Sequence, residues 1–531
     1  MYNRGITEPA QIEPFLAADE RLQNDPFLLP DMEKAVARIY HALISGETIA
    51  VYGDFDADGV CGTALLSQAL SSFGGGVIPY IPHRLKEGYG LNLAALESLR
   101  GQGVTLVITV DCGTSAISEV EYAQRIGLDV IITDHHLTPP LIPSAQAVVN
   151  PQREDSNYPF PHLAGVGVAF KLLQALFQSL GRERGLEELL DLVALGTVAD
   201  VVPLLGENRY LVKRGLEVLN KTKRLGLGEM IQRAGLVSGN IDTEDISWLL
   251  APRLNAPGRL DHAITSYELL VADIPEEAQR LAQEVGQKNA ERQRLTEEVL
   301  AKAREKIFTG RIDSPLLMVG GEDYHPGVIG LVAGKLVDEF YHPAVVFQED
   351  KDIARGSARS ISEFNITAAL GECQELLSRF GGHPLAAGFA LPTQNLPLLR
   401  ERLLHVAERE LSGKDLRPFL TVEAEVPLLA IRGGVFKTLE QLVPFGQGNP
   451  EPNLLSRRVE VMECRKVGND GEHLKLKLKE GNVVWEGVGF DLGALASEVT
   501  PYLDIVYNLR VDRWGGEEML QLNILDFSPA S

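Results

Sequence analysis

The sequence predicts an α/β protein in which two α/β units are joined by a long helix and followed by a small β-barrel. From Thr48, apolar stretches alternate with helical stretches of about 10–15 residues, as in a doubly wound parallel sheet with helices on both faces. Residues 274–308 are polar and contain glycine or proline at two positions only, which is typical of a helix that connects domains. From residue 418, short alternating segments separated by turn signals indicate a small barrel or sandwich.

The first α/β unit is predicted over residues 46–273, after an N-terminal extension of residues 1–45 that has a helical pattern at 31–44. Its strands are apolar throughout because a parallel sheet is buried on both faces. Strands are expected at 47–54, 76–82, 104–111, 129–136 and 145–150, and helices at 59–73, 92–102 and 115–127. From residue 163 onward the unit is predicted to be mostly helical.

The rest of the chain is divided into a connecting helix (274–310), a second, smaller α/β domain (311–414) and a barrel domain (415–531). In the second domain we expect strands at 314–321, 343–348 and 353–360, a helix at 328–340, and further helices to about residue 412. In the barrel domain we expect strands at 420–426, 459–467, 473–480, 483–490, 503–514 and 520–527.

Composition excludes several classes of protein. The chain has 531 residues, of which 45% are hydrophobic and 23% charged, as in an ordinary globular protein of several domains. No apolar run is long enough to span a membrane, and the first residues lack the pattern of a secretory leader, so we expect a cytoplasmic protein without membrane partners. The four cysteines form no CxxC pair, which argues against a disulfide framework and a zinc site. The net charge of −23 argues against a protein that coats nucleic acid, but a nuclease needs only a local basic track.

The segment Asp54-Phe55-Asp56-Ala57-Asp58-Gly59 directly follows an apolar strand. If the strand continues, alternation of side chains aims Asp54, Asp56 and Asp58 in the same direction. Three carboxylates that close together repel one another unless a cation lies among them. The segment therefore indicates either a divalent-metal site or a solvated acidic turn.

Two further strands end in side chains that can bind a metal, which favours the metal site. One ends at Asp111 and another at Asp134-His135-His136. The carboxyl ends of parallel strands form one edge of the sheet, so these groups are expected to meet Asp54, Asp56 and Asp58 there. Asp200 is the one carboxylate in an apolar stretch, and a buried lone aspartate is costly unless it is bound. Its alternatives are a helix cap or an arginine partner.

Carboxylates and imidazoles without thiolates suit a hard or borderline divalent cation, so Mn²⁺ fits best and Mg²⁺ is the alternative. The ligands are too many for one ion with open positions, which favours two ions bridged by a carboxylate. Such a pair stabilises the attacking and leaving oxygens of a displacement at phosphorus. The reaction class is therefore metal-assisted phosphoester hydrolysis.

The motifs DFDADG, VDCG, TDHH and ADVVP resemble those of the DHH phosphoesterase superfamily, and GGHPLAAG (381–388) resembles the signature of its second, DHHA1-like domain. The resemblance implies that Asp54 and His136 lie in the immediate shell, as ligand or catalytic support, and that His383 lies across the interdomain cleft near the scissile phosphate. It assigns metal binding to Asp56, Asp58, Asp111, His135 and Asp200.

Other stretches resemble the RecJ family of this superfamily, namely 81–92, 251–260, 325–336, 354–360 and 444–452. This resemblance implies a single-stranded-DNA-specific 5′→3′ exonuclease of recombination and repair. It also implies a single-strand-binding protein and a RecQ-type helicase as partners.

Basic residues in these stretches are candidates for DNA binding. Arg84, Arg259 and Arg359 lie beside glycine or proline in settings poor in charge, where a guanidinium can be held for bidentate phosphate contact. Ser357 could approach the same phosphate, and the resemblance implies that this group reads a terminal 5′ phosphate. For each arginine the alternative is a structural ion pair.

Lys475 and Lys477 share one face of a predicted strand, opposite leucines. This is the pattern of an OB-fold-like barrel that tracks a single strand, but a solvated edge strand carries the same pattern.

Three alternative functions were weighed against an exonuclease. The dinucleotide phosphodiesterases (nano-RNases and cyclic-dinucleotide enzymes) and the manganese pyrophosphatases of the superfamily resemble only the two α/β units, so residues 418–531 weigh against them. A non-catalytic replication scaffold has eroded ligand positions, whereas every ligand position is intact here.

Overall fold

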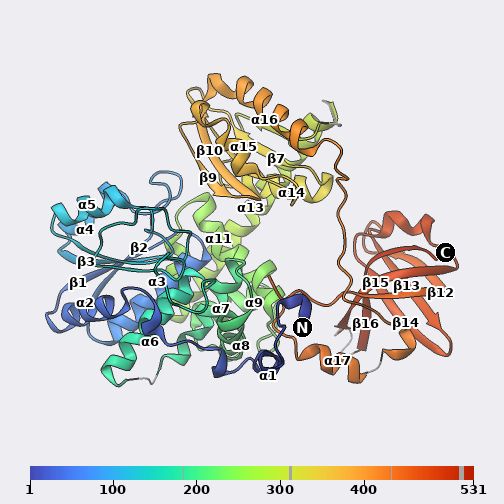
Figure 1. Cartoon of the computed structure of the whole chain (residues 1–531), viewed down its shortest axis with the longest axis horizontal. Helices are drawn as coiled ribbons and strands as arrows, with labels where there is room; N and C mark the ends of the chain where they lie inside the picture. Colours follow the sequence, from blue (N-terminus) through green and yellow to red (C-terminus); the bar gives the residue numbers. More distant parts are fainter. Residues whose placement is uncertain (183–184, 310–313, 432, 513–518, 531) are drawn as a thin grey trace.

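The computed structural model describes residues 1–182, 185–309, 314–431, 433–512 and 519–530. Figure 1 shows the first α/β unit at lower left, the second above it and the barrel at right. An extended stretch leads from the second unit down to the barrel, and the N-terminal segment lies between the first unit and the barrel (Figure 1). Among the described residues, no helix is long and apolar enough to cross a membrane.

The first unit is built on a parallel sheet of strand order β2-β1-β3-β4-β5, as predicted. The strands are β1 (Thr48–Gly53), β2 (Gly76–Tyr80), β3 (Val104–Val110), β4 (Asp129–Thr133) and β5 (Ala147–Val149). Helices α2 (Met32–Ile44), α3 (Ala57–Ser72) and α6 (Gly165–Leu180) share one hydrophobic core with the sheet. Helices α4 (Leu93–Gly101) and α5 (Ile117–Arg125) form a second core with the side chains that the strands direct to the other face of the sheet. The sheet is therefore covered on both faces.

A helical region completes the first unit, as predicted. It contains α7 (Leu190–Ala199), α8 (Gly206–Leu219), α9 (Leu225–Arg233), α11 (Ala251–Leu260) and α12 (Ile264–Val271). The predicted connecting helix is α13 (Pro275–Thr309), a single helix. Leu281 and Val285 of α13 join the core of the first unit, whereas Val299 and Leu300 join a core of the second. Residues 310–313, where we placed the border between connector and second domain, lie outside the described residues.

The second unit has a mixed sheet of order β6-β7-β8-β10-β9. Its elements are β6 (Leu317–Gly321), α14 (Ile329–Phe340), β7 (Ala344–Gln348), β8 (Ile353–Arg359), β9 (Arg379–His383), β10 (Ala386–Pro392) and α16 (Leu396–Leu411). The prediction of helices throughout 361–412 was wrong, because residues 379–392 form the antiparallel pair β9–β10. Short glycine-rich strands carry little periodic signal, and this pair is recognisable mainly by its packing on β8.

The C-terminal domain is a barrel, as predicted. Its strands are the short β11 (Ala424–Glu425), which lies within the strand predicted at 420–426, and β12 (Leu454–Val467), β13 (His473–Glu480), β14 (Val483–Gly489), β15 (Tyr502–Asp512) and β16 (Met519–Pro529). Pairing of β12 with β15 closes the sheet. Leu474, Leu476 and Leu478 point into its core, and Tyr507 is buried there. The end of the strand predicted at 503–514 lies outside the described part of the chain.

Candidate metal centre

Three neighbouring strands of the first sheet bring the predicted ligands to one edge. Asp54 follows β1, Asp111 follows β3, and Asp134 follows β4. These strands are adjacent in the sheet, and backbone bonds continue the pairing to Asp54, whose N–H donates to the Val110 carbonyl at 3.2 Å. The convergence expected at the carboxyl edge is therefore present.

The DFDADG segment reaches this edge by a different geometry from the one predicted. The strand ends at Gly53, and α3 begins at Ala57, so an extended run of alternating aspartates was a wrong expectation. Asp56 caps α3 by accepting from the N–H groups of Asp58 at 3.0 Å and Gly59 at 3.2 Å. A Cβ at Gly59 would lie 2.6 Å from the backbone nitrogen of Asp54, so this close approach requires glycine.

Asp58 is held by the start of α6. Its two carboxylate oxygens accept from the N–H groups of Gly165 at 2.6 Å and Val166 at 2.8 Å. Unpaired N–H groups and the helix dipole favour a carboxylate at this position. Burial and the neighbouring Asp56 nevertheless raise the pKa of Asp58 to about 7, and they outweigh these two hydrogen bonds and the charge of His136, which lower it.

The ligand atoms fall into compact groups in which all of them lie within 4.8 Å of one another. The groups are Asp54–Asp56–Asp111, Asp58–His135–Asp200 and Asp111–His135–His136. Burial is the main cause that raises the pKa of Asp54 and Asp111 well above the ordinary value, and it also raises that of Asp200 to about 9. Neighbouring aspartates raise all three further.

Four buried atoms at this edge have no hydrogen-bond partner among the described residues, namely Asp54 Oδ1, Asp111 Oδ1, His135 Nε2 and Asp200 Oδ2. His135 Nε2 lies 3.0 Å from Asp111 and 3.5 Å from Asp200, and burial lowers the pKa of His135 to about 4. Its ring also bonds the backbone of Leu163, which leaves the lone pair of Nε2 toward the carboxylates. Oxygen and imidazole atoms of this kind, buried and unpaired, fit a divalent cation.

His136 is bound differently from His135. Its Nδ1 lies 2.7 Å from Asp134 Oδ1, and Tyr89 Oη lies 3.2 Å from the same nitrogen. Although burial opposes it, the hydrogen bond with Asp134 raises the pKa of His136 above its ordinary value. Asp134 is fixed in turn by N–H groups of Thr114, His135 and His136. Asp134 was expected at this edge as part of the strand-end run, and the structure shows it orienting His136. Tyr89 lies in the stretch 81–92 but was not predicted as a site residue.

Helix α11 supports the acidic segment from the other side. Asn255 Oδ1 accepts from the Ala57 N–H at 2.7 Å. A Cβ at Gly258 would lie 2.5 Å from the Phe55 carbonyl oxygen. The stretch 251–260 therefore positions the acidic segment as well as carrying Arg259. The role of Asn255 in this was not predicted from the sequence.

The predicted arginines lie together beside the metal-ligand edge. Burial and then the positive charges of Arg84, Arg292 and Arg359 lower the pKa of Arg259 to about 9. Arg359 donates to Ser357 Oγ at 3.2 Å, so Ser357 belongs to the same group. Arg84 lies over the Phe55 ring at 4.7 Å. None of Arg84, Arg259 and Arg359 forms an ion pair within the described ranges, which argues against a structural ion pair as the role of these arginines. We call Arg84, Arg259, Ser357 and Arg359 the arginine group.

His383 is not part of the ligand groups. It ends the exposed edge strand β9, and among the described contacts its carbonyl accepts from Thr367. The start of β9 faces the first unit, because Arg379 Nη1 would lie 3.9 Å from a Cβ at Gly88.

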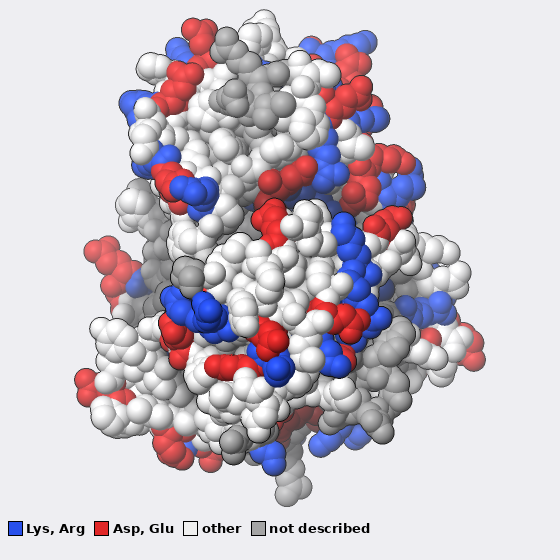
Figure 2. Space-filling view, turned by 90° about the vertical axis from the view of Figure 1, so that its right-hand side faces the viewer, with Lys and Arg blue, Asp and Glu red and all other residues white. Residues whose placement is uncertain are grey.

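The barrel lysines lie outward from the buried leucines, as predicted, but β13 is paired on both sides and is not an edge strand. Lys475 forms an ion pair with Glu486 at 2.7 Å, and Lys479 one with Glu460 at 3.1 Å, whereas Lys477 is exposed. Figure 2 shows that basic side chains on this side of the molecule lie next to acidic ones. The stripe is therefore less basic than its sequence indicates.

Comparison with known proteins matches three parts of the chain to family models. These are the DHH family, N-terminal domain (residues 48–197), the DHHA1 domain (306–409) and the RecJ OB domain (422–526). Together they match the sheet-bearing part of the first unit, the second unit and the barrel, and residues 198–305 lie between the first two matches.

Relatives match over nearly the whole chain. The single-stranded-DNA-specific exonuclease RecJ of Bacillus subtilis is 40% identical over 530 residues, which cover 99% of this chain and 67% of the relative. The enzyme of the same name from Escherichia coli is 34% identical, over 94% of this chain and 91% of the relative. The crystal structure of RecJ in complex with Mn²⁺ from Thermus thermophilus superposes with a TM-score of 0.86 at 31% identity, covering 100% of this chain and 75% of that one. The chain belongs to the RecJ family of single-stranded-DNA-specific exonucleases.

Proposed function

We propose that this protein is a 5′→3′ exonuclease that hydrolyses single-stranded DNA with two divalent cations, Mn²⁺ rather than Mg²⁺ being the better fit. The observation that carries the proposal is the set of unpaired buried atoms at the carboxyl edge of the first sheet. They belong to two ligand groups that share no residue, Asp54–Asp56–Asp111 and Asp58–His135–Asp200. Asp111 Oδ1 and His135 Nε2, which are 3.0 Å apart, bring the two groups into contact, so Asp111 would lie within reach of both cations.

When bound, the two cations supply a water of lowered pKa and offset negative charge on the leaving oxygen. The residues of the chain prepare the site for this chemistry. The N–H groups of Gly165 and Val166 orient Asp58, and the α3 amides orient Asp56. Asp134 holds Nδ1 of His136 and so orients the ring, which leaves Nε2 for a cation or for the phosphate; we propose His136 as a member of the immediate shell, as ligand or catalytic support. Asp54 retains one unpaired oxygen and is assigned as a ligand.

The arginine group gives the proposed polarity. Arg84, Arg259 and Arg359 lie close enough to repel one another, and none of them forms an ion pair with a carboxylate of the described residues, so a doubly charged terminal phosphate would offset their charges. The backbone of Arg259 packs against Gly327 of the second unit, whose Cβ would lie 2.0 Å from its carbonyl oxygen. The group is thus assembled across the two units, beside the metal edge, and a 5′ phosphate bound there would place the first phosphodiester near the cations.

The proposal extends to the second unit and the barrel. His383 lies on the edge strand whose start faces the first unit, and we propose that it contacts the scissile phosphate when DNA is bound. Lys477 and, more weakly, the paired Lys475 are proposed to track the strand along the barrel. A single-strand-binding protein and a RecQ-type helicase are proposed as partners from the family resemblance, and a cytoplasmic location is proposed from the sequence pattern.

One assay tests the function. Labelled single-stranded DNA, duplex DNA and dinucleotides are offered with Mn²⁺ or Mg²⁺. We expect digestion of the single strand from the 5′ end and faster turnover with Mn²⁺. Preference for dinucleotides would favour the phosphodiesterase alternative, and digestion from the 3′ end would contradict the role of the arginine group.

A further inference from the structure

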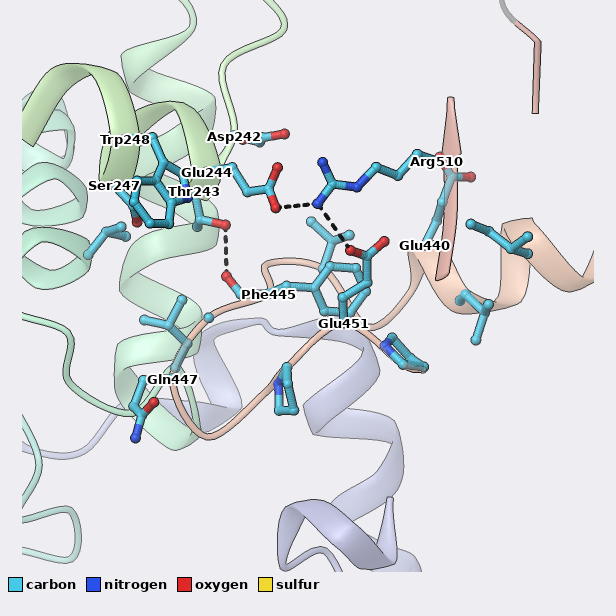
Figure 3. A pocket seen from close by; sticks show the side chains of 18 of the residues that line it. Asp242, Thr243, Glu244, Ser247, Trp248, Glu440, Phe445, Gln447, Glu451 and Arg510 are labelled. Atoms are coloured by element: carbon cyan, nitrogen blue, oxygen red, sulfur yellow. Dashed lines mark hydrogen bonds and ion pairs between the residues drawn. The ribbon is translucent and has the colours of Figure 1, made fainter. Parts of the chain in front are cut away.

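Residues 441–449 (QLVPFGQGN), which we call the latch, join the barrel domain to the first unit. They follow α17 (Gly433–Glu440) and precede β12, yet their carbonyl groups bind residues of the first unit. Phe445 O accepts from Thr243 Oγ1 at 2.7 Å, and Gln447 O accepts from the Leu204 N–H at 2.7 Å. Figure 3 shows the Thr243–Phe445 bond, with Gln447 farther along the same loop.

Arg209 of α8 provides most of the bonds to the latch. Its side chain is fully buried, and its Nη atoms donate to four latch carbonyls, those of Gln441, Leu442, Val443 and Pro444, at 2.7–3.3 Å. Its Nε donates to the carbonyl of Phe15 at 2.7 Å, and the Phe15 ring lies 4.1 Å from the guanidinium. No described carboxylate pairs with Arg209, so the backbone carbonyls are what compensate its burial.

The latch is also rigid on its own account. Asn449 is fully buried and donates to the carbonyls of Leu442 at 2.8 Å and Pro444 at 2.7 Å. Arg4 donates to Asn449 Oδ1 at 2.6 Å. These bonds tie the two ends of the latch together, so the carbonyls bound to Arg209 and the residues near Gly448 are held in one arrangement.

The latch packs on the loop that carries Asp200. A Cβ at Gly446 would lie 2.6 Å from Leu204 Cδ1, and one at Gly448 would lie 3.2 Å from Pro203 Cβ. Asn208, next to Arg209, donates to the Pro203 carbonyl at 3.0 Å. Between Asp200 and these contacts are only Val201 and Val202.

Val201 has a φ of 60°, in the left-handed region that a β-branched residue rarely adopts. Such a conformation persists where the surroundings hold it. Val201 is 66% exposed and, with Val198 and Val202, lines a cavity of about 890 Å³ between the first unit, the latch and the barrel (Figure 3). The loop therefore has space to relax on one side and is restrained by the latch on the other.

We propose that Arg209 is a positioning residue for the metal centre. Through the latch it holds the 201–205 loop, keeps Val201 in its strained conformation, and so places the Asp200 carboxylate 3.5 Å from His135. The inference rests on the proposed metal centre. It assigns a role in metal binding to a residue that contacts no ligand, and it connects seating of the barrel domain to the affinity for the cation.

The test is Mn²⁺ binding to the full chain, measured by calorimetry and by the paramagnetic resonance signal of free Mn²⁺. R209K keeps the charge but cannot donate to all of these carbonyls, and we expect it to weaken Mn²⁺ binding by about tenfold, as loss of outer-shell support does. The matched control is R38K, because Arg38 pairs with Glu47 and Asp129 at the opposite edge of the sheet. It should keep Mn²⁺ affinity within about twofold of wild type, well short of the roughly tenfold or greater loss that follows removal of outer-shell support.

Two further variants keep the test decisive. If R209K does not fold, T243A removes one latch bond and should weaken Mn²⁺ binding in the same direction, by a smaller factor. V201G removes the strain, because glycine adopts positive φ freely, and should recover part of the affinity lost in R209K.

Each result has a distinct meaning. Unchanged Mn²⁺ affinity in folded R209K, equal losses in R209K and R38K, or no recovery in R209K/V201G would each overturn the inference. A wild-type protein that binds no Mn²⁺ would instead overturn the proposed metal centre.

Discussion

The metal edge and the lysine face of the barrel both carry the charged residues that the sequence predicts, but these residues differ in burial and in pairing. At the metal edge, four polar atoms are buried and unpaired. On the barrel, Lys475 and Lys479 are partly exposed and already paired with glutamates. A buried charge without a partner is costly, whereas an exposed ion pair contributes about 0–1 kcal/mol. An unpaired buried charge is therefore the stronger indication of a ligand.

The largest expected effect is at the metal edge. D111N removes the carboxylate charge of one ligand group at its contact with His135 of the other, and it should lower exonuclease turnover by roughly a thousandfold or more, since loss of one transition-state-stabilising group alone costs about 10²–10³. The measurement is turnover on 5′-labelled single-stranded DNA with saturating Mn²⁺. D129N is the matched control, because Asp129 starts β4 at the opposite edge and pairs with Arg38. Equal losses in both variants would mean that the site is misassigned.

The arginine group should give the next largest effect. R359A is expected to reduce the preference for 5′-phosphorylated over 5′-hydroxyl DNA by about tenfold or more, since one hydrogen bond to a charged group contributes about 1.5–3 kcal/mol. Relative kcat/KM on the two substrates measures it. R355A, at an exposed position of the same strand, should leave the preference unchanged. A uniform loss on both substrates would contradict a role in reading the 5′ end.

Removal of the cation should make stability depend on pH. Without it, the pKa of Asp58 is raised from 3.8 to about 7 and that of Asp200 to about 9, so the folded state binds more protons than the unfolded state across this window. The free energy of unfolding of the cation-free protein should therefore fall as pH rises from about 4 to about 9.

The check is thermal unfolding with chelator or Mn²⁺ at about pH 6 and about pH 8. The stabilisation by Mn²⁺ should be larger at the higher pH. Equal stabilisation at both values would indicate that these carboxyls are not the ligands.

The smallest effects belong to the barrel. K477A removes an exposed lysine and should raise KM for long single strands about twofold to threefold and reduce the salt dependence of binding by about one unit of slope. K475A should do less, because Glu486 already offsets Lys475, and E486Q should tighten binding slightly. A larger change in KM for K475A than for K477A would mean that the ion pair with Glu486 does not prevent Lys475 from binding DNA.

The sequence could predict the metal edge because the carboxyl ends of parallel strands must meet, whatever the local turn. It could not predict how DFDADG turns, because alternating aspartates fit a continued strand as well as a helix start capped by Asp56, which is what the structure has. Asn255 and Tyr89 reach the site from distant segments, and only tertiary packing reveals them. Arg209 was missed for the same reason, because its partners are carbonyls that any sequence provides.

The contacts of Arg209 also constrain the order in which the protein can mature. The guanidinium lies in the first unit, but four of its carbonyl partners appear more than 200 residues later in the chain. During synthesis, the start of α8 must therefore stay hydrated until the latch emerges from the ribosome. A fragment that ends before residue 441 would leave the Nη groups of Arg209 without their four carbonyl acceptors. The first unit is then expected to reach its final packing only after most of the chain has been made.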